Sequence, residues 1–266
     1  MTSTLRGTAC FLLILLSIAA SLSGAADKTG IVLLHGKDGT PSNVGTLAAE
    51  LKKNGFAVIT PEMPFSRNRA FDKSYEDCVP EIDNAVALLK KQGATTIFIA
   101  GHSLGASIAL YYGTKTTVDG ILAIAPGGNT GQLGDLVQVE VARARKMVAE
   151  GKGDKIGVFD DYNQGIRHTR RTTARIYLSY QDPDGASVIQ KNAAALKPGT
   201  ALLWVVGTKD PMYQRGASFA FDKAPPNPRN NYVVVEAGHL ETLFDTEAIR
   251  QIVAWIKTDI GGVGLK

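Results

Sequence analysis

The chain alternates between two kinds of segment, and this alternation constrains its fold more than any other feature. Longer stretches with helical spacing of apolar residues separate short apolar runs at 31–34, 56–60, 95–100, 120–125, 201–206 and 232–236. The runs are almost continuously apolar, which is typical of strands covered by helices on both faces. Strands that alternate with helices imply right-handed crossovers and a parallel sheet. The sequence therefore predicts an α/β fold with a mostly parallel sheet of about six strands and helices on both faces.

One long segment, 127–198, interrupts this rhythm between the fourth and fifth apolar runs. It contains no comparable apolar run, except for a possible strand at 174–180. Val137, Val141, Ala144 and Val148 form an apolar stripe with helical spacing. We predict that this segment is a small helical cap insertion that lies over the ends of the strands. The segments expected to form helices outside it are 43–54, 75–92, 104–112 and 246–258.

Composition excludes several classes of protein. Hydrophobic residues make up 44% of the 266 residues and charged residues 20%, which excludes disordered and fibrous chains. The net charge of +4 does not by itself imply nucleic-acid binding, and we expect no nucleic-acid partner. The four histidines are scattered, and neither a phosphate-binding loop nor a dinucleotide fingerprint follows the first apolar run. We therefore expect neither a metal nor another cofactor.

Residues 1–26 have the pattern of a signal peptide. Arg6 precedes the short apolar core at 11–20, and the small residues at 23–26 offer a cleavage site. An uncleaved anchor is the alternative, but the core is shorter than the roughly 20 residues that span a bilayer. We therefore expect a periplasmic or secreted protein with no transmembrane segment after cleavage.

The mature chain is expected to be one domain over 27–266. Cys10 would leave with the signal peptide, so Cys78 would remain alone and no intrachain disulfide could form. We expect Cys78 to be an inert, buried thiol in its helix. The sequence does not indicate an oligomeric state.

The strongest local signal is the pattern from Gly101 to Gly105, Gly-His-Ser-Leu-Gly. It follows an apolar run and opens a segment with helical spacing. Flanking glycines permit a sharp turn that raises Ser103 to the edge of the sheet. The start of the following helix offers unpaired amides to a developing negative charge. The sequence therefore predicts that Ser103 is a nucleophile.

A serine hydroxyl needs a nearby base to act as a nucleophile. His239 follows the sixth apolar run, where a loop can reach back to Ser103, so it is the best candidate base. The side chain of His102 should diverge from that of its neighbour Ser103. The remaining histidines are His35 and His168.

Asp210 is the best candidate for the acid that orients this base, because it follows the fifth apolar run. Its carboxylate would fix the imidazole tautomer and stabilise the imidazolium ion. The rival acids follow no strong apolar run; they are Asp182, Asp184 and Asp245.

These motifs together resemble the α/β-hydrolase superfamily: His-Gly after the first run, Gly-His-Ser-Leu-Gly, Gly-Thr-Lys-Asp-Pro and Ala-Gly-His-Leu. The order Ser, Asp, His along the chain is also that of the family. The resemblance implies an α/β-hydrolase fold and an oxyanion hole formed by the backbone N–H groups of Leu104 and Lys37. We interpret the side chain of Lys37 as a solvated loop lysine.

The resemblance implies an exported serine hydrolase that cleaves a carboxylic ester or thioester of a small acyl substrate. A serine at this position argues against the branches of the family that use aspartate, the haloalkane dehalogenases and epoxide hydrolases. Two alternatives stay open: a peptidase or amidase of the same fold, and a non-catalytic binding protein that retains the fold.

Residues 143–175 form a basic segment with nine Lys or Arg and four Asp or Glu residues. The segment could attract anionic substrates, but a solvated helical face is the interpretation we favour. The acidic and polar stretch at 160–164 could line the pocket or pair with the arginines.

Overall fold

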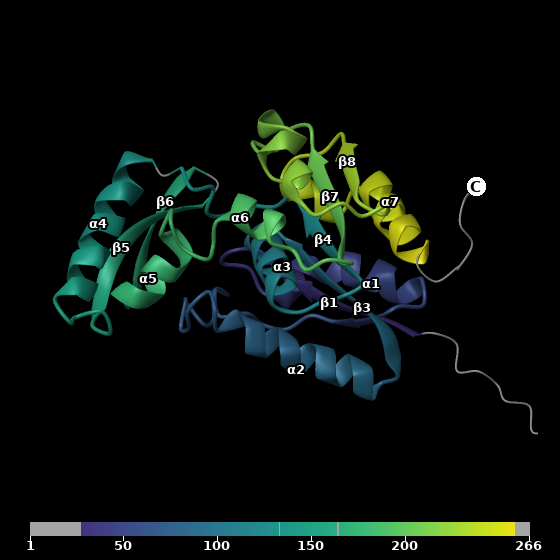
Figure 1. The fold of residues 1–266 in the computed structure, drawn as a ribbon, viewed down its shortest axis with the longest axis horizontal. Helices are drawn as coiled ribbons and strands as arrows, with labels where there is room; N and C mark the ends of the chain where they lie inside the picture. Colours follow the sequence, from purple (N-terminus) through teal and green to yellow (C-terminus); the bar gives the residue numbers. More distant parts are fainter. Residues whose placement is uncertain (1–27, 133, 164, 259–266) are drawn as a thin grey trace, which may run out of the picture.

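A computed structural model describes residues 28–132, 134–163 and 165–258, and the expected signal peptide lies outside this range. Six parallel strands form one sheet in the order β2-β1-β3-β4-β7-β8, which confirms the predicted α/β architecture (Figure 1). The strands are β1 (Lys28–Leu34), β2 (Ala57–Ile59), β3 (Ala94–His102), β4 (Gly120–Ile124), β7 (Ala201–Gly207) and β8 (Asn231–Val235).

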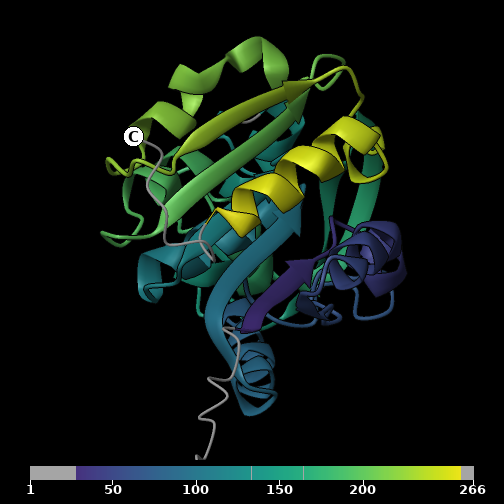
Figure 2. The same cartoon turned by 90° about the vertical axis from the view of Figure 1, so that its right-hand side faces the viewer.

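Helices cover both faces of this sheet. The helices α1 (Gly45–Lys53) and α7 (Thr246–Lys257) pack on one face, where α7 crosses the sheet in Figure 2. The other face is covered by α2 (Cys78–Lys91), α3 (Leu104–Lys115) and α6 (Ile189–Ala194). Short 3₁₀ helices occupy 41–44, 213–215, 217–219, 221–223 and 241–243. In the described part of the chain, no helix combines the length and hydropathy needed to cross a bilayer.

Strand β1 shows why the sheet sequences are continuously apolar. Ile31 and Leu33 belong to the core under α1 and α7, while Val32 and Leu34 belong to the core under α2 and α3. All four side chains are fully buried, and each such burial contributes roughly 1.5–3 kcal/mol. A strand that is buried on both faces therefore has no polar position in its centre.

The insertion between β4 and β7 lies beside the sheet (Figure 1). It contains the helices α4 (Asp135–Ala149) and α5 (Ala174–Gln181) and an antiparallel hairpin of β5 (Ile156–Asn163) and β6 (Ile166–Thr173). These elements enclose a separate small core that includes Val141, Phe159 and Tyr177. We call the segment from α4 to α5 the cap.

The cap differs from the sequence prediction in two respects. The possible strand at 174–180 is wrong, because these residues form α5. The hairpin was not predicted, because most of its apolar side chains are exposed. Its inward residues include Phe159 and Asp161, whereas Ile156 and Val158 are exposed. Periodicity alone therefore gave no signal of a strand in this segment.

The strand order places a switch point between β1 and β3, because β2 lies on one side of β1 and the chain then crosses to the other side. Ligands in open α/β sheets bind beyond the carboxyl ends of the strands at such a point. The loop after β1 and the junction between β3 and α3 meet there. These segments carry Lys37 and Ser103, respectively.

Candidate functional site

Ser103 occupies the turn between β3 and α3 and has φ 56° and ψ −121°. This positive φ is strained for a residue with a side chain, so the strain falls on the serine itself. The flanking glycines are needed for a different reason, because other backbone segments pass too close to them to leave room for a side chain. A Cβ on Gly101 would lie 2.2 Å from the backbone of Gly105, and one on Gly105 would lie 2.5 Å from the carbonyl oxygen of His35. Only glycine fits at either position.

The structure joins His239 to Asp210. The imidazole Nδ1 donates a hydrogen bond to Oδ2 of the Asp210 carboxylate over 2.7 Å. The other carboxylate oxygen accepts from the backbone N–H of Met212 at 2.7 Å. Since a carboxylate only accepts, this contact places the proton of a neutral His239 on Nδ1 and leaves Nε2 as an acceptor.

Backbone hydrogen bonds hold the two loops that carry this pair. Beyond β7 and β8, the N–H of Thr208 donates to the carbonyl of Val235 at 2.8 Å, and that of Lys209 donates to Ala237 at 3.0 Å. The parallel pairing of the strands thus continues into the loops. It fixes the positions from which Asp210 and His239 extend.

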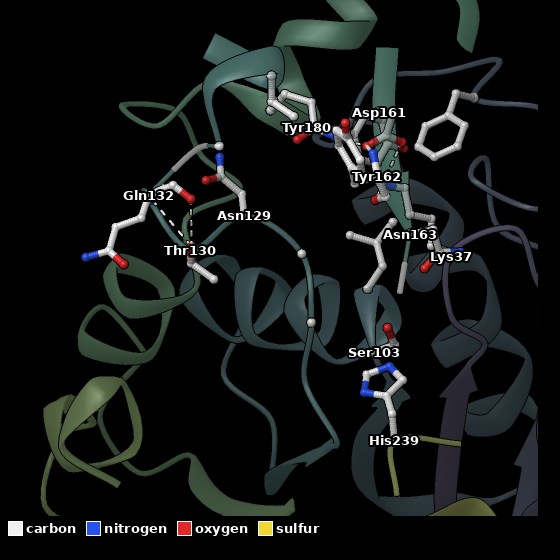
Figure 3. A pocket seen from close by; sticks show the side chains of 17 residues that line it. Lys37, Ser103, Asn129, Thr130, Gln132, Asp161, Tyr162, Asn163, Tyr180 and His239 are labelled. Atoms are coloured by element: carbon white, nitrogen blue, oxygen red, sulfur yellow. Dashed lines mark hydrogen bonds and ion pairs between the residues drawn. The ribbon is translucent and has the colours of Figure 1, made fainter. Parts of the chain in front are cut away.

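Ser103 and His239 lie side by side at the base of a cavity (Figure 3). A Cβ built on Gly127 would lie 3.0 Å from Oγ of Ser103 and 3.6 Å from Cε1 of His239, so both side chains face the same small space. Nε2 of His239 is buried and has no hydrogen-bond partner among the described residues. Because Nδ1 of a neutral His239 carries the proton, Nε2 is able to accept a hydrogen bond.

The other histidines of this region have structural contacts. Nε2 of His102 donates to the backbone carbonyl of His239 at 2.8 Å, and the two rings lie 4.9 Å apart. Burial lowers the pKa of His102 to about 4, so the ring is neutral. His35 donates to the carbonyl of Gly36 and accepts from the N–H of Met63. Nε2 of His102 is therefore occupied by the backbone of the loop that carries His239.

The rival acids are engaged elsewhere. Asp182 and Asp184 pair with Arg145 at 2.5 Å and 2.9 Å. Asp245 caps α7 by accepting from the N–H of Ala248 at 2.7 Å. Asp210 is the one of the four candidate acids that contacts His239.

The loop after β1 packs directly against the serine. A Cβ on Gly36 would lie 3.2 Å from Cβ of Ser103. Lys37 and Leu104, the predicted oxyanion residues, both line the cavity at Ser103. Their amide roles stay a prediction.

The interpretation of Lys37 as a solvated lysine is wrong. Its side chain is only 13% exposed and reaches across to the cap. The ammonium lies 2.7 Å and 2.6 Å from the two carboxylate oxygens of Asp161 and donates to the carbonyl of Tyr162 at 2.9 Å. Burial lowers the pKa of the Lys37 amine, and the nearby Asp161 carboxylate opposes this shift.

Asp161 is the centre of this contact between the cap and the loop. It is 2% exposed and accepts hydrogen bonds from Lys37, Arg170, Gln181 and the N–H of Tyr162. Burial would raise the pKa of the Asp161 carboxyl, but the charges and hydrogen bonds of Lys37 and Arg170 lower it below its usual value. The carboxyl is therefore ionised at neutral pH.

Arg170 extends the same contact to Asp38. Its two terminal nitrogens each lie 2.5 Å from a carboxylate oxygen of Asp38, while Nε donates to Asp161 at 2.9 Å. The guanidinium also stacks over the ring of Phe71 at 4.7 Å. We call Lys37, Asp38, Asp161 and Arg170 the latch, since they connect the cap to the loop after β1.

The rest of the basic segment is largely a solvated and paired surface. Seven of its nine basic residues form ion pairs with carboxylates, and Arg170, at 13% exposed, is the least exposed of these seven. This agrees with the interpretation favoured from the sequence. The stretch at 160–164 both lines the cavity and pairs with arginines. Asp160 pairs with Arg167, whereas Asp161, Tyr162 and Asn163 line the cavity; Gln164 lies outside the described residues.

The cavity has a volume of about 250 Å³ and lies between the cap and the carboxyl ends of the strands. In Figure 3, Ser103 and His239 form its base, with Asn129 and Thr130 on one side and Tyr162 on the other. A second, more open cavity of about 340 Å³ meets the same serine and histidine from outside the cap. No group of three or more potential ligands in the described residues could hold a metal ion.

The sequence matches the profile of the "Alpha/beta hydrolase family" over residues 31–255. The chain belongs to this family. A curated relative, the thermostable monoacylglycerol lipase of Bacillus sp. (strain H-257), is 32% identical over 85 residues. That match spans 31% of this chain and 34% of the lipase, about a third of each protein.

Solved structures of other α/β hydrolases have the same fold. A Paleococcus ferrophilus monoacylglycerol lipase is 21% identical with a TM-score of 0.62, covering 87% of this chain and 96% of the other. A thermostable carboxyl esterase from Bacillus coagulans is 14% identical with a TM-score of 0.64, covering 88% and 91%. At these identities the likeness shows the fold.

Sequence reasoning about this α/β hydrolase missed most of the cavity wall. Gly127 was noted only as the start of the segment 127–198, yet it faces both Ser103 and His239. Phe71 and Gln181 carried no local signal at all, although both line the cavity. Each lies in an element that reaches the site only through the tertiary fold.

Proposed function

We propose that this α/β hydrolase is a serine hydrolase that cleaves carboxylic esters, with Ser103 as nucleophile, His239 as base and Asp210 as the orienting acid. The supporting observation is the 2.7 Å contact from Nδ1 of His239 to Asp210, which leaves a buried and unpartnered Nε2 beside Ser103. The partial match to a curated monoacylglycerol lipase supports an ester substrate over an amide.

In this mechanism, Oγ of Ser103 attacks the acyl carbon while Nε2 of His239 takes the hydroxyl proton. Asp210 stabilises the resulting imidazolium ion. The N–H groups of Leu104 and Lys37 stabilise the tetrahedral oxyanion, a contribution of roughly 10²–10³ in rate for each such donor. His239 then protonates the leaving alcohol, and a water activated by the same imidazole releases the acid from Ser103.

A fluorophosphonate probe tests this proposal, because it reacts with an activated serine irrespective of the natural substrate. We expect labelling of the wild-type protein at Ser103 and none of a Ser103→Ala variant. Ser107→Ala is the matched control, since Ser107 lies one turn along α3 and its buried hydroxyl has no hydrogen-bond partner among the described residues. Absence of labelling in both wild type and control would refute the mechanism.

We also propose that residues 1–26 direct export and that the mature protein acts outside the cytoplasm. The short apolar core with small residues after it supports this proposal. Fractionation of expressing bacterial cells followed by N-terminal sequencing tests it. Recovery of a full-length chain from the cytoplasm alone would contradict it.

A further inference from the structure

Arg170 connects the cap to two loops of the core, and each contact uses a different part of its side chain. Its two terminal nitrogens hold Asp38 in the loop after β1, while Nε donates to Asp161 in β5. The face of the guanidinium lies 4.7 Å from the ring centre of Phe71, in the loop between β2 and α2. A planar fork can make all these contacts together, whereas the ammonium of a lysine is a single charge.

Both loops have a strained backbone at the point where Arg170 contacts them. Asp38 has φ 56° and Phe71 has φ 61°, a left-handed conformation that is unfavourable for residues with a side chain. Ser103 has the same φ of 56° in the nucleophile turn. Such conformations persist where surrounding contacts hold them, and they gather at functional sites. The pair with Arg170 and a longer contact of 3.4 Å from Asn163 hold the Asp38 carboxylate.

The strained Asp38 directly follows the predicted oxyanion donor. The N–H of Lys37 makes no hydrogen bond to the described residues, whereas the N–H of Asp38 donates to the carbonyl of Phe65 at 3.0 Å. The φ of Asp38 sets the angle between Lys37 and the segment that this hydrogen bond anchors. If Asp38 relaxed to a negative φ, the N–H of Lys37 would therefore move relative to Ser103.

Arg170 also separates two carboxylates at the boundary between cap and core. It binds Asp38 on the core side and Asp161 on the cap side. Lys37 is already paired with Asp161. Loss of Arg170 would leave two like charges facing each other, and their repulsion would push the loop away from the cap.

We propose that Arg170 is a positioning residue for the reaction. Its side chain holds Asp38 in the left-handed conformation that directs the N–H of Lys37 at the oxyanion on Ser103. Arg170 lines neither cavity at Ser103, so it acts through Asp38 and not on the substrate. This inference rests on the proposed hydrolase function. It makes the docked cap a requirement for catalysis.

Arg170→Met tests the proposal, because methionine keeps an unbranched stem beside Phe71 and removes the guanidinium. We expect kcat on p-nitrophenyl butyrate to fall by at least about tenfold, within the roughly 10²–10³ that loss of one oxyanion donor costs. A butyl trifluoromethyl ketone adds to Ser103 to form a tetrahedral adduct. Its Ki should rise by about the same factor as kcat/KM falls, because it mimics the transition state.

Arg143→Met is the matched control and should keep the wild-type kcat and Ki. Arg143 is also a cap arginine that pairs with a carboxylate, that of Glu140, and lies over a phenylalanine ring, 4.4 Å from the centre of Phe159. Its remaining contact is with the carbonyl of Val158. All these partners belong to the cap, so the control loses an arginine without releasing the loop after β1.

A second substitution separates positioning from a general loss of stability. Glycine adopts a positive φ without strain, so Asp38→Gly removes the need for Arg170 to hold residue 38. The double variant of Arg170→Met with Asp38→Gly should recover at least about fivefold in kcat over Arg170→Met, because the two residues act through one contact. Asp38→Gly adds no contact, so it would not reverse a loss of stability.

The outcomes separate this proposal from the hydrolase function. Circular dichroism shows whether Arg170→Met is folded; if it is not, Arg170→Lys replaces it, since the ammonium keeps the charge but not the fork. A wild-type kcat in the folded variant, or no recovery in the corresponding double variant, would overturn the positioning role. Absence of fluorophosphonate labelling in the wild-type protein would overturn the hydrolase function itself.

Discussion

Replacing Asp161 by asparagine should destabilise the protein more than any other single charge removal in the cap. The change keeps the shape of the side chain but removes its charge and brings amide hydrogens into a site that holds only donors. Asp161 is 2% exposed and accepts from Lys37, Arg170, Gln181 and the N–H of Tyr162. The substitution Asp161→Asn leaves the ammonium of Lys37 without a carboxylate partner.

The expected loss follows from the geometry of the latch. Breaking a buried ion pair by removing one partner costs about 3–5 kcal/mol. Arg170 retains Asp38, and Lys37 is 13% exposed, so the loss should lie near about 3 kcal/mol. With a urea slope of about 3 kcal/mol per M, the unfolding midpoint should fall by about 1 M.

The assay is urea unfolding followed by far-ultraviolet circular dichroism at neutral pH. Asp154→Asn is the matched control, because Asp154 is 82% exposed and pairs with the exposed Arg175. An exposed pair contributes about 0–1 kcal/mol, so the control should shift the midpoint by less than about 0.3 M. Equal shifts for Asp161→Asn and the control would refute the reasoning about the latch.

A second substitution tests whether the stranded charge causes the loss. Lys37→Met in the Asp161→Asn background removes the unpaired ammonium and keeps the backbone N–H of residue 37. The double variant should therefore be more stable than Asp161→Asn alone, since contacting residues do not act additively. Additive losses would show that the two side chains stabilise the protein independently.

Three further predictions concern single side chains. Asp210→Asn should lower kcat about 10⁴-fold with little change in KM, because the amide favours the wrong tautomer of His239, as steady-state kinetics on a p-nitrophenyl ester would show. Burial lowers the pKa of His102 from 6.5 to about 4. As the pH falls from 7 to 4, His102 is therefore protonated in the unfolded chain before it is protonated in the folded one. The free energy of unfolding should drop by about 3 kcal/mol over this pH range. Urea unfolding of His102→Gln at pH 7 and pH 4 should show a smaller drop; an equal drop would refute the assignment. Burial raises the pKa of Cys78, so iodoacetamide should modify this thiol only in unfolded protein, as peptide mass spectrometry would detect.

The sheet was predictable because its signals are local. Each buried strand, such as β4 or β7, is a continuous apolar run that ends at Gly or Pro, and burial on both faces requires no more than that. The positions of Ser103, Asp210 and His239 followed from the same reasoning, because each comes just after a strand. The parallel order of the sheet then brings these strand ends to one edge.

The cap hairpin was not predictable, because its burial pattern reverses the usual one. Asp161 faces inward at 2% exposed, and Ile156, Val158 and Ile166 face solvent. A half-buried strand is inferred from alternating apolar and polar residues, and a carboxylate at an inward position breaks that alternation. It is tolerated there only because Lys37 and Arg170 neutralise it.

The ion pairs of the latch could not be predicted from the sequence, because their partners are far apart along the chain. Lys37 and Asp161 are separated by 124 residues in sequence, as Asp38 and Arg170 are by 132. A loop lysine in isolation has the pattern of a solvated side chain, and only the fold supplies its buried partner. The side chain and the backbone of Lys37 have different roles. The ammonium connects the cap to the loop after β1, while the N–H of Lys37 faces the oxyanion at Ser103 in the proposed mechanism. Loosening the cap should therefore affect the oxyanion hole as well as the substrate cavity, so kcat and KM of Asp161→Asn should change together.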